Sequence, residues 1–457
     1  MRERIERALR AVPVRYAELR WEQIDRSAVD LHSRTLVRAT TAVDEGGIVR
    51  VLAPGGGWGT ATLSALDDLD RALAAALESA RAVESEEILL HPIEPVVDER
   101  SSVLKEDFRR VSLLAKRQLL EGYEDLMLGH DRRIQDTRAG YRDSFRRIWY
   151  ATSEGTWIRD ERPLVDLYFE AIAVSGDDLQ VASEGLGRAL GFECARNQEE
   201  LARSAARRAV AMLEARPVKG GIYTVITDPT LTGVFIHEAF GHLCEADHIA
   251  ENPRLEELIR LGKRVGPDFL NVSDYAAPEA QGLMGNFHFD DEGVPGGRTE
   301  LIREGVLVGR LHSRETAARL GGRPTGNARA QDFHHEPLVR MTKTVIERGE
   351  TSVEKLFEGI ALGLYARGSR GGMTELGRYS FGAEEAFLIR DGKLAERVRD
   401  VTLSGNIFDT LRNVSAVGDD FKLDSRGRCG KSGQTAPVSL GGPHVRIENV
   451  VVGGEFA

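Results

Sequence analysis

The feature that most constrains this chain is a short stretch near its middle, residues 231–248, which reads LTGVFIHEAFGHLCEADH. An apolar run leads into His237, Glu238 and His242. In the common zinc-protease signature H-E-x-x-H, the two histidines share one face of a helix. Here they lie five residues apart instead of four. On a regular helix, a separation of five residues is about 140° beyond a full turn, so the two side chains would not share a face. Either the helix is distorted between them, for example by a π-bulge near Gly241, or the pair does not share a metal.

A catalytic zinc has three protein ligands, an open position for water, and a base that takes the proton of that water. His237 and His242 are two candidate ligands, and Glu238 is placed to act as the base. The nearby candidates for the third ligand are Cys244, Glu245, Asp247 and His248. Cys244 and His248 share a face of a regular helix, but they lie about 10 Å or more along its axis from His237. They would therefore form a separate site.

Cys429 is a distant candidate for the third ligand. It lies in the segment Arg426–Gln434, where flanking glycines leave its sulfur approachable. Arg428 and Lys431 favour the thiolate, which is the form that binds metal. The alternative is a tight turn that carries an incidental thiol, and the spacing alone leaves both interpretations open.

Three consecutive acidic residues, Asp290, Asp291 and Glu292, precede Gly293 in the second half of the chain. A cation-binding loop would need ligands at alternate positions, as in an EF-hand, and this segment lacks them. The pattern favours a solvated or turn-capping role.

Composition bounds the class of protein. The chain has 457 residues, of which 41% are hydrophobic and 29% charged, as in ordinary globular proteins of two domains. A net charge of −11 argues against a general nucleic-acid binder. Three widely spaced cysteines fit a reducing compartment. The first residues contain no apolar signal segment, and the most apolar run is too short to cross a membrane. We therefore expect a cytoplasmic protein without a membrane partner.

The order of predicted elements indicates an α+β fold with two domains. Residues 1–217 combine short antiparallel strands with long helices, without strict strand–helix alternation. Pro217, Gly220 and Gly221 mark the boundary. Residues 218–457 are rich in short strands separated by glycine turns, and they carry the helix of the histidine motif.

Six segments of the second domain occur in an order that resembles one protein family. They are the histidine motif at 237–247, Phe289–Gly293, Thr325–Arg329, Arg340–Thr344, Cys429–Gln434 and Val451–Gly454. This set resembles the TldD/PmbA family of zinc metallopeptidases, in its metal-binding TldD type. The resemblance covers nearly all of the second domain and only the general style of the first.

The resemblance implies a function and a site. His237, His242 and Cys429 would bind Zn²⁺, and Glu238 would act as the base. Cys244 occupies a position expected to be aliphatic, which weakens it as a ligand. Family members form homodimers or pair with a paralogue that lacks the metal motif. They cleave unfolded peptides, including precursors of modified ribosomal peptides and an antitoxin.

We therefore expect a zinc-dependent peptidase that hydrolyses unfolded or extended peptides with a zinc-activated water and a glutamate base. Two alternatives remain open from the sequence. One is a non-catalytic partner subunit of a peptide-processing complex. The other is a zinc hydrolase of non-peptide amides.

Overall fold

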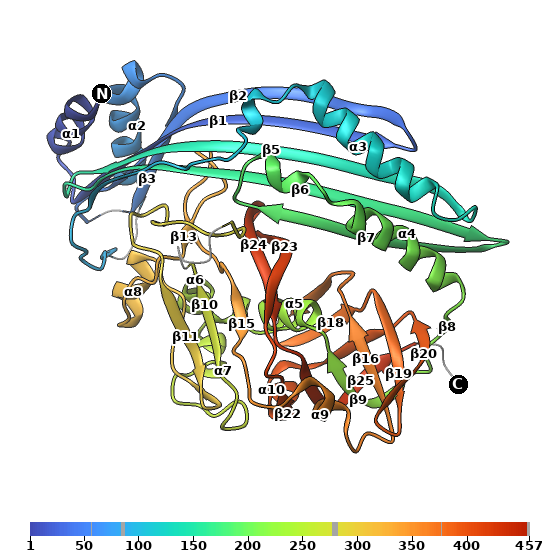
Figure 1. The fold of residues 1–457 in the computed structure, drawn as a ribbon. Helices are drawn as coiled ribbons and strands as arrows, with labels where there is room; N and C mark the ends of the chain where they lie inside the picture. The colour runs from blue at the N-terminus through green and yellow to red at the C-terminus, as the bar shows by residue number, and fades with distance from the viewer. Residues whose placement is uncertain (56, 84–86, 277–281, 376, 455–457) are drawn as a thin grey trace.

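The computed structural model describes residues 1–55, 57–83, 87–276, 282–375 and 377–454. It has an α+β fold, as predicted, and two large sheets dominate it. Figure 1 shows the long strands of the first sheet arching over a lower body that contains the second sheet. Among the described residues, no helix is both long and apolar enough to cross a membrane.

The first sheet has the strand order β3-β2-β1-β5-β6-β4, with β7 also paired to β6. Its pairs are antiparallel except for β4 with β6. Its strands are β1 (Tyr16–His32), β2 (Thr35–Leu52), β3 (Trp58–Leu63), β4 (Val97–Arg100), β5 (Ile134–Thr152), β6 (Trp157–Ser175) and β7 (Asp178–Arg188).

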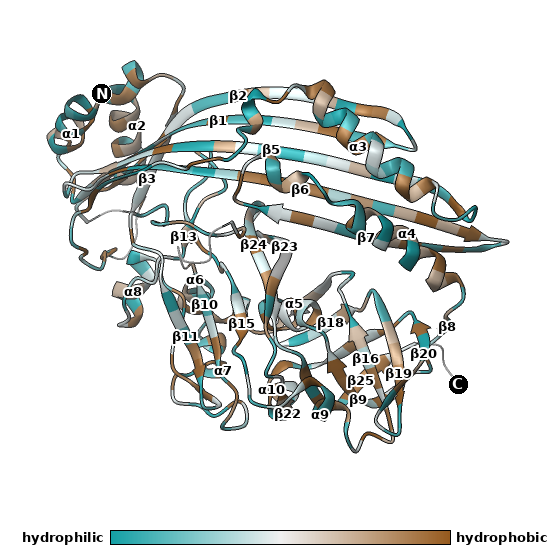
Figure 2. Cartoon of the chain, viewed as in Figure 1, coloured by the Kyte–Doolittle hydropathy of each residue, from teal (hydrophilic) through white to brown (hydrophobic). Residues whose placement is uncertain are grey.

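Four helices pack with this sheet: α1 (Arg2–Ala11), α2 (Leu69–Ala82), α3 (Leu113–Leu128) and α4 (Glu199–Leu213). Helices α3 and α4 lie along its outer, convex face (Figure 1) and cover the apolar residues of β5, β6 and β7. Helices α1 and α2 bury a smaller cluster at the end near β3. Hydropathy alternates along the long strands in Figure 2, because successive side chains point to opposite faces. The concave face is therefore free to carry polar groups.

The second sheet is built from β9 (Gly221–Thr227) and strands of the C-terminal half, in the order β17-β18-β21-β25-β9-β16-β19-β20-β8, with β22 paired to β25. These strands are β8 (Arg216–Pro217), β16 (Leu362–Arg367), β17 (Gly372–Glu375), β18 (Arg378–Gly382), β19 (Glu385–Arg390), β20 (Lys393–Arg399), β21 (Thr402–Asn406), β22 (Val414–Val417) and β25 (Val445–Gly453).

Smaller units complete the lower body. A four-stranded sheet contains β10 (Val272–Tyr275), β11 (Arg298–Arg303), β12 (Val306–Leu307) and β15 (Thr344–Ile346). Two strand pairs are β13 (Ala328–Arg329) with β14 (Leu338–Val339), and β23 (Lys422–Lys431) with β24 (Gln434–Gly442). The helices are α5 (Pro229–Ala239), α6 (Ala246–Glu251), α7 (Pro253–Leu258), α8 (Arg314–Leu320), α9 (Val353–Phe357) and α10 (Ile407–Arg412).

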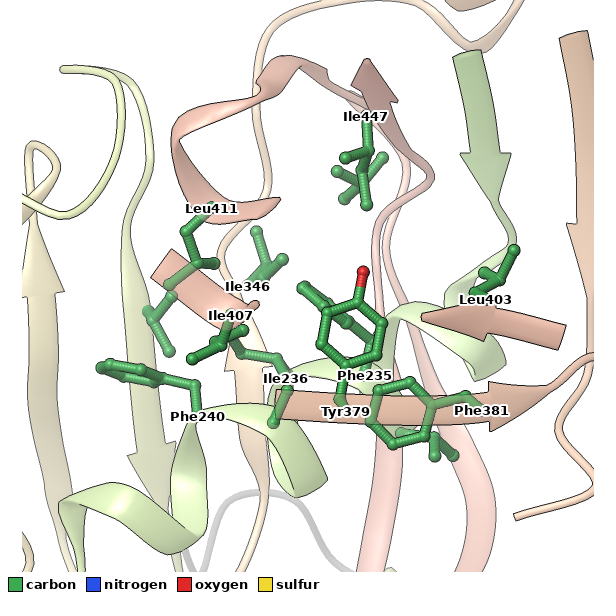
Figure 3. Packing of buried hydrophobic residues seen from close by; sticks show 14 of the residues in the cluster. Phe235, Ile236, Phe240, Ile346, Tyr379, Phe381, Leu403, Ile407, Leu411 and Ile447 are labelled. Atoms are coloured by element: carbon green, nitrogen blue, oxygen red, sulfur yellow. The ribbon is translucent and has the colours of Figure 1, made fainter. Parts of the chain in front are cut away.

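Helix α5 lies at the centre of the largest hydrophobic core. Its start is set by Asp228, whose side chain accepts a hydrogen bond of 2.9 Å from the N–H of Leu231, and by Pro229 in the first turn. Phe235 and Ile236 pack among Tyr379, Phe381 and other apolar residues (Figure 3), and the rings of Phe235 and Tyr379 meet edge to face at 5.4 Å. This packing fixes the helix that carries His237 and Glu238.

Glycines bring the β23–β24 hairpin against α5. A Cβ added at Gly233 of α5 would lie 2.1 Å from the backbone nitrogen of Gly441 in β24, so only glycine allows this approach. The hairpin turns at Ser432 and Gly433, which both have positive φ, as a two-residue turn requires. Figure 1 shows the hairpin rising beside α5 toward the first sheet.

Several predicted elements differ in length from those observed. The short strands predicted for the first domain are in fact long: β1 runs unbroken from Tyr16 to His32. The first sheet is almost but not entirely antiparallel, because of β4. The domain boundary at residue 217 stays a prediction, although β8 already pairs with β20 in the second sheet.

Candidate metal centre

The helix that carries the histidine motif breaks between the two histidines, as the spacing predicted. Helix α5 ends at Ala239, Phe240 has an irregular backbone with φ −123° and ψ −42°, and a 3-10 turn follows over Gly241–Cys244. The distortion is thus the end of a helix and not a π-bulge. A Cβ at Gly241 would lie 2.0 Å from the sulfur of Met341, so the break is also a place of close packing.

His237, His242 and Cys429 come together at this break. One potential ligand atom from each lies within 4.8 Å of the other two. The Sγ of Cys429 is 3.5 Å from Nε2 of His242, and the two imidazole rings lie 5.3 Å apart at 82°. The chain folds back across 187 positions to bring Cys429 to His242.

The charge state of Cys429 suits a metal ligand. Burial alone would raise the pKa of the thiol, but hydrogen bonds with His237 and His242 outweigh it and lower this pKa to about 5. Cys429 is therefore a thiolate at neutral pH. The Nδ1 atom of His237 is buried without a hydrogen-bond partner among the described residues. A thiolate and two imidazoles, one of which has an orphaned ring nitrogen, form a donor set that fits zinc.

Glu238 lies at the mouth of this group. Its Oε2 is 3.8 Å from Nε2 of His242, and its side chain is one-third exposed. It also lines a cavity of about 550 Å³. Glu238 is thus the acidic group of the motif that both approaches the histidines and reaches open space, as a base for water requires.

A buried carboxylate, Glu245, supports His242 from behind. Its Oε2 lies 3.0 Å from Nδ1 of His242, and its side chain has no exposed surface. Burial opposes ionisation of Glu245, but hydrogen bonds and charge from His242 and Lys431 outweigh it and lower its pKa to about 2. The ionised carboxylate accepts the Nδ1–H and so directs Nε2 of His242 toward the sulfur of Cys429.

Lys431 links this carboxylate to the cysteine hairpin. Its Nζ lies 3.1 Å from Glu245 and donates hydrogen bonds of 2.7 Å to Asp247 and 2.9 Å to the carbonyl of Val339. Lys431 belongs to the same strand as Cys429. The ammonium also occupies the space between Glu245 and Asp247, which together with His248 are the second group of potential ligands. That group is better described as an ion-paired anchor than as a metal site.

Two buried arginines hold the other side of the hairpin. Arg340 donates to the carbonyl oxygens of Cys429 and Gln434, and Arg329 donates to that of Pro437 at 2.7 Å. Sequence reasoning did not identify Glu245, Lys431, Arg329 or Arg340 as supports. The spacing of Glu245 from His242 is a possible signal, because residues three apart lie on the same side of a helical turn.

The remaining candidates lie apart from His237, His242 and Cys429. Cys244 is buried, its pKa is raised by burial, and it belongs to neither described group of potential ligands. His248 is 44% exposed and lies 3.7 Å from Glu245.

The acidic segment 290–292 is buried, so the solvated role we considered is wrong and the turn-capping role is confirmed. Asp290 accepts hydrogen bonds of 2.9 Å from the N–H groups of Glu292, Val294 and Ala328. The charges of the other two carboxylates are met by arginines of the first sheet: Arg162 lies 3.1 Å from Asp291, and Arg50 lies 3.4 Å from Glu292. The segment therefore ties this loop of the lower body to the first sheet.

Three family models for the PmbA/TldA metallopeptidases match the chain. They are the C-terminal domain at residues 220–454, the central domain at 106–213 and domain 1 at 17–80. The chain belongs to this family, PmbA/TldD. The resemblance noted in the sequence is thereby confirmed and extends to the N-terminal half.

Relatives with assigned names agree with this placement. A metalloprotease of Synechocystis is 45% identical over 444 residues, which cover 97% of this chain and 95% of the relative. A zinc metalloprotease TldD homolog of Saccharolobus solfataricus is 36% identical over 69% of this chain and 70% of the relative. The names of both relatives and of the matching family models are those of metallopeptidases.

Solved structures share the fold at low identity. A protein of Thermotoga maritima, described as a modulator of a DNA gyrase, has a TM-score of 0.77 at 21% identity and covers 96% of both chains. TldE of Thermococcus kodakarensis has a TM-score of 0.76 at 18% identity, covering 99% of this chain and all of that one. At such identities the likeness shows the fold alone.

Proposed function

We propose that the protein is a zinc-dependent peptidase of unfolded or extended peptides, with His237, His242 and Cys429 as the metal ligands and Glu238 as the base. The observation that carries the proposal is the convergence of these four side chains at the break after α5, beside an open cavity. Zinc at this position would acidify a water toward a pKa of about 7 and polarise the scissile carbonyl.

The chain's own residues supply the other parts of the mechanism. Glu238 takes a proton from the attacking water and gives one to the leaving amine. Glu245 holds the Nδ1–H of His242 and so keeps its Nε2 directed at the metal position. Lys431 and Arg340 hold the hairpin so that the sulfur of Cys429 faces both histidines.

An extended substrate fits the space beside Glu238. The 550 Å³ cavity is lined by residues of β7 in the first sheet and of β23 in the hairpin. Among the described strands, β7 is paired on one side with β6, and β23 with β24. A peptide in the cleft can add to such an edge through backbone hydrogen bonds, which demands an extended chain and no particular sequence. We further propose that the protein acts as a homodimer or with a paralogue that lacks the metal motif.

The test compares wild-type protein with Glu238→Gln for bound zinc and for hydrolysis of an unfolded casein-like chain. We expect both proteins to retain one equivalent of zinc, and the variant to lose activity by about 10²- to 10⁴-fold. Glu251→Gln, a change of the same kind at an exposed residue that ends α6, is the matched control and should behave as wild type.

Three outcomes would contradict parts of the proposal. Full activity in Glu238→Gln would exclude this carboxylate as the base. Zinc-loaded wild-type protein that hydrolyses no unstructured peptide would support a non-catalytic partner subunit. Hydrolysis confined to small non-peptide amides would support the third alternative.

A further inference from the structure

The cavity beside Glu238 continues as a cleft beneath the first sheet. Three neighbouring cavities of about 550, 340 and 280 Å³ all have Arg428 in their walls. Arg428 precedes Cys429 in the chain, so the three cavities meet next to the candidate metal centre. A peptide long enough to pass the metal centre would extend into the second and third cavities, which lie against the concave face of the sheet.

The second cavity has exposed cations on its walls. Arg26, Arg38 and Arg142 project from strands β1, β2 and β5, and their side chains are 42%, 42% and 45% exposed. Arg428 on the hairpin is also 45% exposed. Four guanidinium groups from three strands and the hairpin therefore border one space.

The carboxylates on the same walls are buried and already paired. Asp143 is 3% exposed beneath Lys116, and Asp166 is 3% exposed beneath Arg426 and Arg428. Three more carboxylates stand nearby: Asp44 is exposed beside Arg26, Asp30 is half-buried between Arg38 and Arg142, and Asp332 lies 3.9 Å from Arg26. Five arginines (Arg26, Arg38, Arg142, Arg426 and Arg428) thus stand against four carboxylates (Asp30, Asp44, Asp166 and Asp332), which leaves one excess positive charge on this surface, although the whole chain carries a net charge of −11. A cleft with one sign of charge attracts ligands of the other sign.

From this arrangement we propose that the cleft selects peptides with acidic side chains at positions several residues from the bond that is cut. Arg26, Arg38 and Arg142 are the specificity-determining residues, and they bind substrate carboxylates without taking part in the reaction. The proposal rests on the peptidase function proposed above. Backbone pairing at a sheet edge would hold any extended peptide, and the arginines would add a preference among such peptides.

The test measures binding and cleavage separately. Three peptides of equal length and low structure carry a cluster of glutamates, of glutamines or of lysines at one end. Their affinities are measured by fluorescence anisotropy with zinc-loaded Glu238→Gln, and kcat and KM are measured with wild type. We expect the acidic peptide to bind most tightly, and its advantage to shrink as salt rises to 0.5 M, because exposed charges are screened.

The key variant is Arg26→Gln combined with Arg38→Gln and Arg142→Gln. Each exposed charge contributes about twofold to fivefold, so the acidic peptide should lose roughly tenfold or more in affinity and KM, with kcat retained. The matched control is Arg71→Gln with Arg207→Gln and Arg303→Gln, which removes three exposed, carboxylate-paired arginines away from the cleft. The control should keep the wild-type preference.

The outcomes separate this inference from the function on which it rests. Equal affinity for the three peptides, or equal loss in the cleft and control variants, would overturn the acidic preference while leaving the peptidase intact. If wild type cleaves no peptide but Glu238→Gln still prefers the acidic one, the peptidase proposal fails and the binding site stands. Thermal unfolding of each variant confirms that it is folded before it is compared.

Discussion

Replacing Glu245 with alanine should weaken zinc binding without touching a ligand. Glu245 is wholly buried, its Oε2 is 3.0 Å from Nδ1 of His242, and its pKa of about 2 keeps it ionised. A hydrogen bond to a charged partner contributes about 1.5–3 kcal/mol. Since about 1.4 kcal/mol corresponds to a factor of ten, we expect zinc affinity to fall about 10- to 100-fold, the range found for partners of metal-bound histidines.

The assay is competition for zinc between metal-free protein and a fluorescent chelator. Glu245→Gln should fall between wild type and Glu245→Ala, because the amide oxygen still accepts the Nδ1–H but has no charge. Cobalt substitution adds a spectroscopic readout, since a freely rotating His242 should change the absorption of the bound ion. Glu251→Ala, at the exposed last residue of the adjacent helix α6, is the control for a lost carboxylate.

Loss of folding has to be separated from loss of orientation. In Glu245→Ala, Lys431 keeps Asp247 and the carbonyl of Val339 as partners, so its charge is not stranded. Thermal unfolding of the metal-free proteins measures how much folding stability the variant keeps. If Glu245→Ala is folded and binds zinc within twofold of wild type, the reasoning that assigns Glu245 to His242 is refuted.

Three further results follow from the same geometry. His242 and Lys431 lower the pKa of Glu245 from 4.5 to about 2, against the effect of burial. The ionised carboxylate therefore stabilises the fold fully above pH 4.5, and this stabilisation is lost as the pH falls toward 2. In chemical unfolding of the metal-free proteins, the free energy of unfolding should fall on acidification by on the order of 2–3 kcal/mol more in wild type than in Glu245→Gln. Gly233→Ala should destabilise the protein by about 1–3 kcal/mol, because the added Cβ meets the backbone of Gly441. Gly122→Ala in α3 is the control and should be neutral or stabilising, because a Cβ there meets nothing within 4 Å. Equal shifts in the thermal unfolding of the two variants would contradict this prediction. Cys429→Ser should lose more zinc affinity than Glu245→Ala, whereas Cys244→Ala should bind zinc as wild type does, as metal analysis after dialysis would show.

The sequence predicted the local distortion of the motif but not the partners that surround it. The extra residue between His237 and His242 excludes a regular helix if both side chains face one metal, and the helix does end at Ala239. Nothing in the spacing favoured Cys429 over an incidental thiol; only the family resemblance did. Its approach depends on close backbone packing at Gly233 and Gly441, far apart in the chain.

Long-range pairing also explains the errors. Short strands were predicted where polar residues interrupt the alternation. The structure pairs β1 on both sides, with β2 and β5, along most of its length. Because of this pairing, the strand continues through the interruptions. The acidic residues Asp291 and Glu292 looked solvated because their arginines, Arg162 and Arg50, lie 129 and 242 positions earlier in the chain. Local patterns do not contain such partners.

The separation in sequence between the two halves of the candidate metal centre determines when the site can be completed during synthesis of the chain. His237 and His242 leave the ribosome long before Cys429, which must then cross 187 positions to reach them. A nascent or truncated chain that contains the histidine motif and Glu238 lacks the thiolate and its hairpin. Under the proposed function, hydrolytic capacity would therefore arise only after 429 of the 457 residues have been made, and earlier unfolded segments of the chain would not meet an active site.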